Sequence, residues 1–198
     1  MKTSFEHIST KVARDFVLSK GDNVVATITP GFCTLDLRAV FNGITMDDDG
    51  NNFHYDLKKN GVYPSMVMRP IPKEIKDLRA IQEGLVLQAK NGLRKFGLGT
   101  DTAPHLTEHK HREGGSCGQF WAPHAHEMYA WIFERLGILD DYPRFACDIM
   151  PDFYGIKDKL PKKTVTLKRM PLTIQDDYNG IIPPLAGQTI PWSVAYEQ

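Results

Sequence analysis

The sequence of 198 residues has no charge excess, no paired set of cysteines and no long apolar run. The 24 Lys and Arg residues balance 24 Asp and Glu residues, so no net charge draws the chain to nucleic acid or to an anionic membrane. The three cysteines are widely spaced and fit neither a disulfide framework nor a CxxC zinc site, so we expect reduced thiols. The N-terminal segment has no signal-peptide core and no segment could cross a bilayer, which favours a cytoplasmic location.

Internal repeats and low-complexity tracts are missing too, whereas hydrophobic residues make up 41% of the chain and can form a sizeable core. We therefore expect a single domain over residues 1–198, with small molecules or proteins as its partners.

Three strand-then-helix units are expected along the first 137 residues. Strands are predicted at 4–8, 23–29 and 95–99. The first helix follows an N-cap at Ser9 or Thr10, with Val12, Phe16 and Val17 on one face. Pro30 and Gly31 end the second strand.

The second helix is expected from Lys73 to Lys90, with Asn91-Gly92 as its stop, and Ile75, Leu78, Ile81 and Leu85 form its apolar stripe. The third follows Pro123 and ends at Gly137. The polar segment 47–52 is placed on the surface. Residues 138–198 form an extension, in which 164–167 and 189–194 alternate like edge strands of a small β appendage.

This order predicts an α/β fold with parallel strands and right-handed crossovers, in which reactive groups gather at the carboxyl ends of the strands. A complete (β/α) barrel needs about eight such units, and only three can be counted here. The pattern therefore indicates part of a TIM-type barrel with a small C-terminal β appendage.

His7 and Asp101 stand at two such strand ends. The imidazole of His7 could bind a metal, although a lone histidine fits a structural or merely polar role as well. The carboxylate of Asp101 could take a proton from a metal-bound water and return it to a leaving nitrogen, as amide hydrolysis requires. The alternative for Asp101 is a helix or turn cap.

The loop after Asp101 is basic and rich in glycine. His105, His109 and His111 lie there with Lys110 and Arg112, a grouping suited to a substrate carboxylate and, less well, to zinc. Glycines in the run 114–118 allow a close approach of backbone N–H groups to a ligand, or a hinge. Cys117 has no evident partner base, so a cysteine nucleophile is disfavoured. His124 and His126 are expected on a helix surface.

The segment Leu98–His105, LGTDTAPH, is similar to the signature of the single-domain, bacterial and fungal dihydroorotases of the amidohydrolase superfamily, where it ends the last barrel strand. Other segments resemble the same family: FEHISTK at 5–11 its sixth strand, ATITP at 26–30 its seventh, RPIPK at 69–73 the lead into the next helix, and PDFYG at 151–155 and PLAGQTIPWSV at 184–194 its closing segments. The resemblance covers almost the whole chain and implies the C-terminal part of such a barrel.

The resemblance implies a role for each matching residue. His7 matches a ligand of one metal in a two-zinc centre, and Asp101 matches a ligand of the other metal that also shuttles the proton. His105 matches a residue that binds the substrate carboxylate. Backbone groups that hold the pyrimidine ring are implied at Arg69, Ala103, Cys117 and Gly118. The implied reaction is the reversible cyclisation of N-carbamoyl-L-aspartate to dihydroorotate in pyrimidine biosynthesis.

The family's remaining metal ligands have no counterpart, because the match begins at the sixth strand. The missing groups are a His-x-His pair, a carboxylated lysine and a further histidine, together with an arginine and an asparagine that bind substrate. Two zincs need about three to five ligands each, and this chain offers two ligands in all. We therefore expect weak or partial zinc binding. Gly31-Phe32, Met66 and the loop before Cys117 also depart from the family pattern.

Two hypotheses follow. The chain is either a dihydroorotase component, inactive in isolation, whose front half is a separate chain or was lost from this gene, or a non-catalytic remnant that acts as a binding or assembly module. An adjacent reading frame for the first five strands would favour the component. Three barrel strands leave unpaired edges and an exposed apolar face, so a homo-oligomer or a companion chain that supplies the missing barrel half is expected.

Overall fold

The centre of the molecule is a short parallel sheet. The computed structural model describes residues 1–46, 53–55, 61–161 and 163–195. Within them, β1 (Thr3–Phe5), β2 (Val24–Ile28) and β5 (Phe96–Leu98) form a sheet in the order β1-β2-β5. All pairs are parallel, with Ser4 opposite Val25 and Thr27 opposite Gly97. The three carboxyl ends therefore lie at one edge of the sheet, as the sequence predicted.

The middle strand β2 is buried because its apolar side chains are covered on both faces. Val25, Ala26 and Ile28 are each at most 1% exposed. On one side Val25 packs in a small cluster with Ile149, Met150 and Phe153 of the chain after residue 138. On the other side Ala26 and Ile28 join the main core. A parallel strand covered on both faces requires this continuous apolar run.

Helix α1 (Lys11–Leu18) begins at Thr10, whose hydroxyl accepts the backbone N–H of Ala13. Its predicted shared face is wrong: Val17 is 1% exposed, whereas Val12 is 79% and Phe16 is 44% exposed. The helix packs on α4 through the side that carries Arg14 and Val17, which turns Val12 and Phe16 outward. Phe16 contacts Phe5 of β1 there, with ring centroids 5.4 Å apart.

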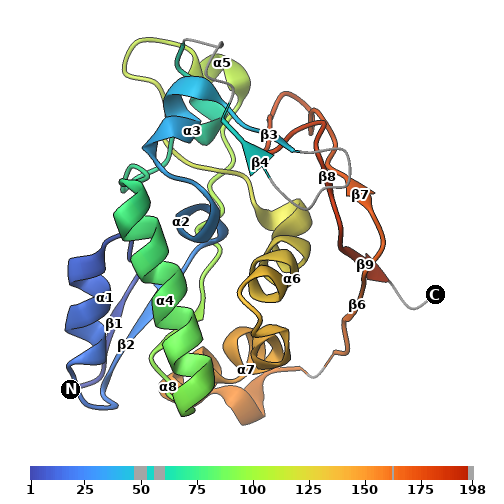
Figure 1. Cartoon of the computed structure of the whole chain (residues 1–198). Helices are drawn as coiled ribbons and strands as arrows, with labels where there is room; N and C mark the ends of the chain where they lie inside the picture. Colours follow the sequence, from blue (N-terminus) through green and yellow to red (C-terminus); the bar gives the residue numbers. More distant parts are fainter. Residues whose placement is uncertain (47–52, 56–60, 162, 196–198) are drawn as a thin grey trace.

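Helix α4 (Ile75–Asn91) follows the prediction closely and ends at Gly92, which adopts the left-handed conformation. Leu78, Ile81 and Leu85 are buried, while Ile75 at its first turn is exposed. Figure 1 shows α4 crossing in front of the sheet, with α1 at the left edge of the molecule.

The connection between β2 and α4 contains elements that the sequence did not predict. Pro30 and Gly31 do not simply stop the strand, because they begin a short helix, α2, whose N-cap Thr29 accepts the N–H of Gly31. The bounds are α2 (Pro30–Thr34), α3 (Leu37–Asn42), β3 (Thr45–Met46), β4 (Phe53–His54) and η1 (Pro64–Met66). The polar segment 47–52 lies outside the described residues.

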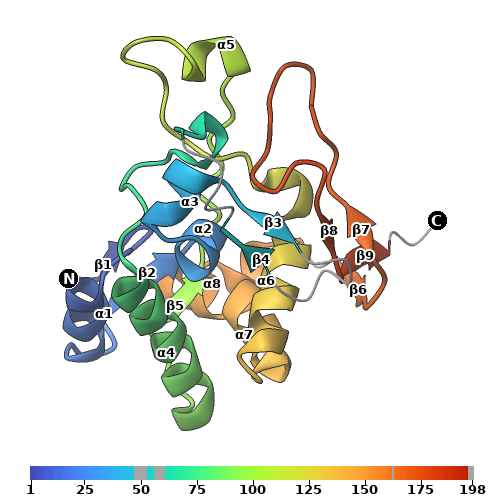
Figure 2. The same ribbon diagram turned by 45° about the horizontal axis from the view of Figure 1, so that its top comes forward.

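Helix α6 (Ala125–Arg135) forms the centre of the main core, with Met128, Tyr129 and Ile132 at most 2% exposed. Shorter helices lie before and after it: α5 (Thr107–Lys110), η2 (Ala122–His124), η3 (Leu139–Asp141), α7 (Tyr142–Cys147), α8 (Ile149–Tyr154) and η4 (Lys157–Lys159). Helices α7 and α8 pack against β5 (Figure 2).

The C-terminal extension ends in two small antiparallel pairs. β6 (Thr166–Lys168) pairs with β9 (Ser193–Ala195), and β7 (Leu172–Thr173) pairs with β8 (Thr189–Ile190). The predicted single strand 189–194 is thus two strands with different partners, separated by Pro191 and Trp192, where proline removes a backbone donor. Both pairs lie beside α6, on the side of the molecule away from α1 (Figure 1). No helix in the described part of the chain is long and apolar enough to span a membrane.

Candidate active site

His7 and Asp101 lie together at the carboxyl edge of the sheet. His7 Nδ1 is 3.9 Å from Asp101 Oδ1, and the two side chains keep 36% and 28% of their surface exposed. Both residues have positive φ, 41° for His7 and 46° for Asp101. A non-glycine residue in this region costs about 1 to 3 kcal/mol and persists where the surroundings impose it, often at functional sites. The pair is therefore held in place and remains accessible to a ligand.

The turn that presents His7 is fixed by Thr27 of β2. The Thr27 hydroxyl accepts the backbone N–H of His7 at 2.7 Å and donates to Glu6 Oε2 at 2.7 Å. Glu6 also accepts hydrogen bonds from Ser4 and Tyr154. Partial burial raises the pKa of Glu6, but these hydrogen bonds and the neighbouring His7 outweigh it, so its net pKa lies below the usual value.

The chain that carries Asp101 approaches β2 closely at Gly99. A Cβ on Gly99 would lie 2.5 Å from the Thr27 Cβ, so only glycine fits. Nearby, the buried Tyr129 hydroxyl donates to the carbonyl of Ile28 at 2.6 Å. Burial raises the pKa of Tyr129 well above its ordinary value, which keeps the hydroxyl a donor. Gly99 thus lets the chain after β5 lie against Thr27, and Tyr129 is hydrogen-bonded to the last residue of β2.

The carboxyl group of Asp101 is shifted towards its protonated form. Burial raises its pKa, a protonated His7 lowers it, and the negative charge of Glu6 raises it further, with a net upward shift. A carboxylate with a raised pKa is a better proton acceptor at neutral pH than an ordinary aspartate.

The predicted substrate-binding residues are brought together by the loop after Asp101. The backbone N–H of Ala103 donates to Gln119 O at 2.9 Å, and a Cβ on Gly118 would lie 2.6 Å from the Ala103 Cβ. His105 Nε2 lies 3.2 Å from the carbonyl of Cys117. Because a carbonyl only accepts, Nε2 carries the proton in this contact, and Nδ1 is the nitrogen left to face a ligand.

Lys110 fastens this loop to the segment that contains Arg69. Its Nζ reaches the carbonyl oxygens of Gly118 at 2.6 Å, Val67 at 3.2 Å and Ser116 at 3.4 Å. Gly118 N–H also donates to Val67 O at 3.0 Å. Arg69, two residues beyond Val67, is exposed and precedes Pro70. The ammonium group thus connects the two segments through hydrogen bonds. Burial lowers the pKa of Lys110.

Three other histidines have neighbours different from those of His7 and Asp101. His109 is 3.4 Å from Glu108, and His126 Nδ1 is 2.6 Å from the Tyr142 hydroxyl. The surface position predicted for His124 is wrong, since its side chain is 1% exposed and packs edge-on to Trp121. Cys33, Cys117 and Cys147 are free thiols.

No protein-family model matches the chain. Curated relatives do: the dihydroorotase of Shewanella sediminis (strain HAW-EB3) is 37% identical over 201 residues, which cover 98% of this chain and 51% of the relative. That of Sphingopyxis alaskensis (strain DSM 13593 / LMG 18877 / RB2256) is 35% identical over 192 residues, 97% of this chain and 50% of the relative. This chain is similar to the dihydroorotases, and the match fits their C-terminal part.

Solved dihydroorotase structures share the fold. The crystal structure of the Saccharomyces cerevisiae dihydroorotase in complex with 5-fluoroorotic acid matches with a TM-score of 0.73 at 25% identity, covering 100% of this chain and 52% of that chain. The Campylobacter jejuni dihydroorotase matches with a TM-score of 0.72 at 24% identity. The chain spans about half the length of the dihydroorotases that it matches.

Dihydroorotases are generally zinc-dependent, so the fit of zinc to this chain can be tested on its own residues. A catalytic zinc takes about three protein ligands. In the ranges that the structure describes, no group of three or more His, Cys, Asp or Glu side chains is placed to hold a metal. His7 and Asp101 are a pair, and by themselves they do not make a complete zinc site.

The residues that support the site were not singled out by the sequence. Glu6 and Thr27 are ordinary polar residues within strand-like runs, and their contact depends on the register of β1 against β2. Lys110 was assigned to a basic surface, but its half-buried ammonium is engaged with carbonyl groups. The only signal for Tyr129 was its place in an apolar helix, where a buried hydroxyl needs a partner.

Proposed function

We propose that this chain is the C-terminal component of a dihydroorotase and contributes to the reversible cyclisation of N-carbamoyl-L-aspartate to dihydroorotate in the cytoplasm. The observation that carries the proposal is the pairing of His7 and Asp101, 3.9 Å apart at the carboxyl edge of a parallel sheet, each at positive φ. Positive φ at two partly exposed polar residues is a conformation that is often found at functional sites.

In this proposal Asp101 is the proton-transferring group. Its carboxylate takes a proton from the attacking water and returns it to the ring nitrogen as the amide bond breaks. His7 and Asp101 are the two groups that the chain offers towards a shared zinc centre. The other ligands come from a second polypeptide.

The substrate lies against the loop after Asp101. His105 Nε2–H donates to Cys117 O, so Nδ1 faces the substrate carboxylate and donates to it when the ring carries its second proton. Backbone groups of Arg69, Ala103, Cys117 and Gly118 bind the pyrimidine ring, except the N–H groups of Ala103 and Gly118, which donate to Gln119 O and Val67 O. The Saccharomyces cerevisiae relative was crystallised with 5-fluoroorotic acid, a pyrimidine carboxylate, which supports this class of ligand.

The fold is proposed to be the last three units of a TIM-type barrel, with residues 1–137 as the β/α units and 138–198 as the extension of one domain. A barrel of this type has eight strands, and the described sheet has three. In the described residues β1 pairs only with β2, and Val12 and Phe16 of α1 stand exposed next to it. A companion chain bearing the first five strands would cover this edge and supply the missing ligands.

The test is dihydroorotate hydrolysis in the presence of zinc, by the chain alone and by the chain assembled with the N-terminal half of the Shewanella sediminis relative. We expect background rates for the chain alone and turnover for the pair. Asp101→Asn should abolish that turnover. His7→Ala should lower it by a smaller factor. Robust turnover by the chain alone, or a pair that tolerates Asp101→Asn, would contradict the proposal.

The second candidate is a non-catalytic module that keeps the dihydroorotase fold for assembly or ligand binding. The observation in its favour is the lack of a third metal-ligating side chain near His7 and Asp101 within the described residues. On this hypothesis the chain assembles with the companion half, and the assembly shows no turnover in the presence of zinc.

A further inference from the structure

The side chain of Glu6 lies on the face of the sheet that carries Thr27. In the parallel pairing of β1 with β2, Ser4 lies opposite Val25. Side chains alternate between the two faces along a strand, so Glu6 shares the face of Ser4 and Val25, whereas Phe5 points to the other face. Thr27 follows two residues after Val25 and therefore meets Glu6 at the carboxyl edge of the sheet.

Both carboxylate oxygens of Glu6 accept hydrogen bonds from hydroxyl groups. Oε1 accepts from the Ser4 hydroxyl at 2.7 Å, and Oε2 accepts from the Thr27 hydroxyl at 2.7 Å. The hydroxyl of Tyr154, in α8, makes a longer contact with Oε1 at 3.4 Å. Glu6 is an exposed residue. Its carboxylate is therefore held in one position by these hydroxyl donors and not by burial in the core.

The carboxylate of Glu6 sets the direction of the Thr27 hydroxyl. A hydroxyl group has one hydrogen to donate and two lone pairs that accept. Because the hydrogen of Thr27 is directed at Glu6, the lone pairs are left for the backbone N–H of His7, which donates at 2.7 Å. A hydrogen bond to an ionised acceptor is stronger than one between neutral groups. Without that acceptor the hydroxyl is free to rotate, and the N–H of His7 loses a fixed partner.

His7 depends on this partner because its φ is 41°. A residue other than glycine keeps this conformation where its surroundings impose it. We propose that Glu6 is a positioning residue of the candidate site: through the Thr27 hydroxyl it holds His7 in the turn conformation that faces Asp101, 3.9 Å away. The effect on catalysis rests on the proposed dihydroorotase function, whereas the effect on the His7 turn does not.

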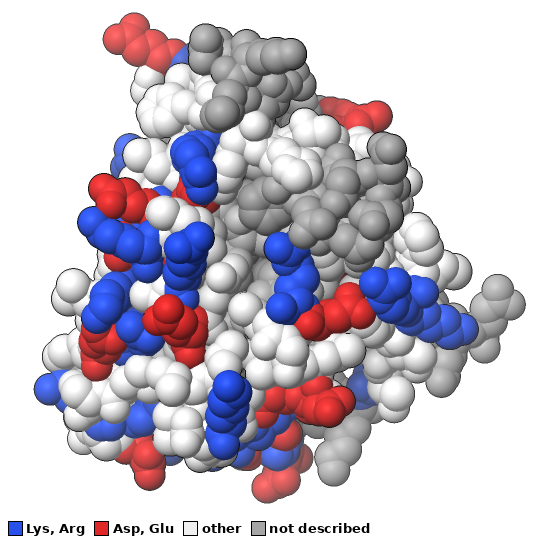
Figure 3. All heavy atoms as spheres, in the orientation of Figure 1, with Lys and Arg blue, Asp and Glu red and all other residues white. Residues whose placement is uncertain are grey.

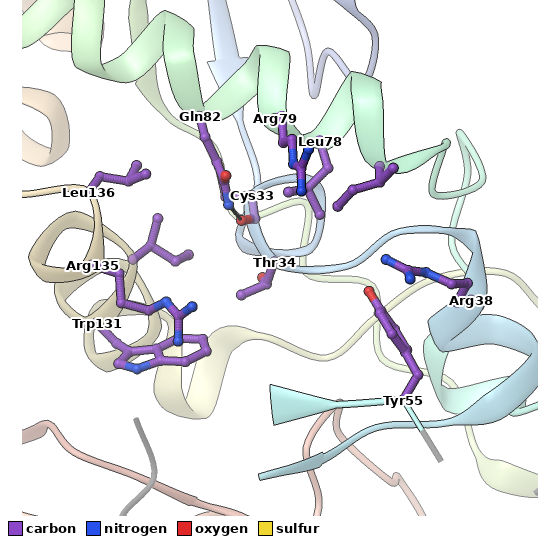
Figure 4. Close-up of a pocket in the computed structure, with 12 residues that line it drawn as sticks. Cys33, Thr34, Arg38, Tyr55, Leu78, Arg79, Gln82, Trp131, Arg135 and Leu136 are labelled. Atoms are coloured by element: carbon purple, nitrogen blue, oxygen red, sulfur yellow. Dashed lines mark hydrogen bonds between the residues drawn. The ribbon is translucent and has the colours of Figure 1, made fainter. Parts of the chain in front are cut away.

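Helix α4 supplies a control position, because its buried residues belong to the main core together with Ile28, on the face of β2 that is turned away from Glu6. Figure 3 shows acidic and basic side chains interspersed over α1 and α4. Gln82 of α4 points into a pocket of about 300 Å³ among α2, α4 and α6 (Figure 4). The side chain of Glu83 is 66% exposed and lies 3.6 Å from Arg14. Its removal changes one surface charge and none of the partners of Glu6.

Three substitutions in the full chain separate the hydrogen bond from the charge. Glu6→Met removes both, and the amide hydrogen exchange of His7 should become about tenfold or more faster. Glu6→Asp keeps the charge but withdraws it by one methylene group, so exchange should also become faster. Glu6→Gln keeps an acceptor oxygen for Thr27, while its NH₂ group donates to the Ser4 hydroxyl, and exchange should stay within about threefold of that in the unmodified chain. The backbone chemical shifts of His7, which report its φ, should follow the same order.

The amides of Ala26 and Phe96 in the sheet report global stability, and Glu83→Met should leave the exchange of His7 unchanged. In the pair formed with the N-terminal half of the Shewanella sediminis relative, Glu6→Met should lower kcat about tenfold or more and leave KM within about twofold.

Three results would overturn the positioning role of Glu6: an unchanged His7 amide in Glu6→Met, an equal effect of Glu83→Met, or a Glu6→Gln variant as impaired as Glu6→Met. An undiminished kcat of the Glu6→Met pair would do the same. An inactive pair with the unmodified chain would contradict the proposed function alone, because the exchange measurement needs no turnover.

Discussion

The hydroxyl of Thr27 accepts the backbone N–H of His7 at 2.7 Å and thereby holds the turn after β1 against the end of β2. The same hydroxyl donates to Glu6. One side chain of the middle strand thus fixes the position of a residue in the neighbouring turn, and Gly99, directly after β5, leaves room for that side chain. The candidate site is built on the sheet itself and does not depend on the loops alone.

Thr27→Val should therefore destabilise the protein while preserving side-chain shape. Two hydrogen bonds are lost, one of them to a carboxylate, and the N–H of His7 is left without its partner, at a cost of about 2 kcal/mol. Urea unfolding followed by circular dichroism measures this loss. Thr27→Ser keeps the hydroxyl and should retain most of the stability, so equal losses in both variants would mean that the methyl contacts matter and the hydrogen bonds do not.

Lys110→Met should loosen the segment 115–118 without unfolding the sheet. The ammonium contacts three carbonyl groups, and its removal should cost about 2 kcal/mol, most of it local. Amide hydrogen exchange is the measurement: the N–H groups of Ser116 and Gly118 should exchange faster, while those of β2 keep their protection. Lys90→Met, on the exposed end of α4, is the control and should change neither.

His124 should make stability depend on acid pH. Both ring nitrogens lack a hydrogen-bond partner in the described structure, and burial lowers the pKa of His124 to about 4. The unfolded chain, with an ordinary imidazole, takes up the proton first as the pH falls. The contribution of neutral His124 to the free energy of unfolding is therefore fully present above about pH 6.5. It is lost progressively down to about pH 4, by about 3 kcal/mol in total.

The matched pair for this effect is His124→Phe and His111→Gln. His124→Phe keeps an aromatic ring against Trp121, removes the titrating group, and should flatten the stability profile between pH 6.5 and 4. His111 is exposed, and its replacement should leave the profile unchanged. Unfolding free energies across this range decide the matter, and a slope that persists in His124→Phe would assign the acid sensitivity to another group.

The strands and long helices could be predicted because each has a local cause. The run VVATI is β-branched and apolar, and α4 has a regular stripe ended by Gly92. The short elements depend on distant contacts. Gly31 is required because a Cβ there would lie 2.6 Å from the Gln119 side chain, so what looked like a strand stop is a tightly packed helix. No local pattern contains that information.

The position of His7 and Asp101 at one sheet edge could be predicted from the sequence, whereas the residues that hold them in place could not. His7 and Asp101 stand at strand ends, which topology alone brings to one edge. Glu6, Thr27 and Lys110 act through the register of the strands and the path of a loop, which only the folded chain defines. The burial of His124 depends on packing against Trp121 and could not be inferred from its position at a helix start.

Binding of orotate by the chain alone should be weak. His105 and the loop backbone are present, but the arginine and asparagine implied by the family resemblance are not. The loss of these two polar contacts should reduce the binding free energy by several kcal/mol, on the order of 3. Calorimetric titration should give an affinity in the millimolar range that falls further in His105→Ala. Micromolar binding, or binding indifferent to His105→Ala, would count against the role of this histidine.

Zinc analysis after dialysis against a weak chelator tests the central claim most directly, because that claim is that His7 and Asp101 are one part of a metal centre shared between two chains. The isolated chain should retain only substoichiometric zinc. The pair formed with the N-terminal half of a dihydroorotase should retain a two-zinc centre, and His7→Ala or Asp101→Asn should reduce its zinc content. A full two-zinc complement on the isolated chain would contradict the account, as would a pair whose zinc is unaffected by both substitutions.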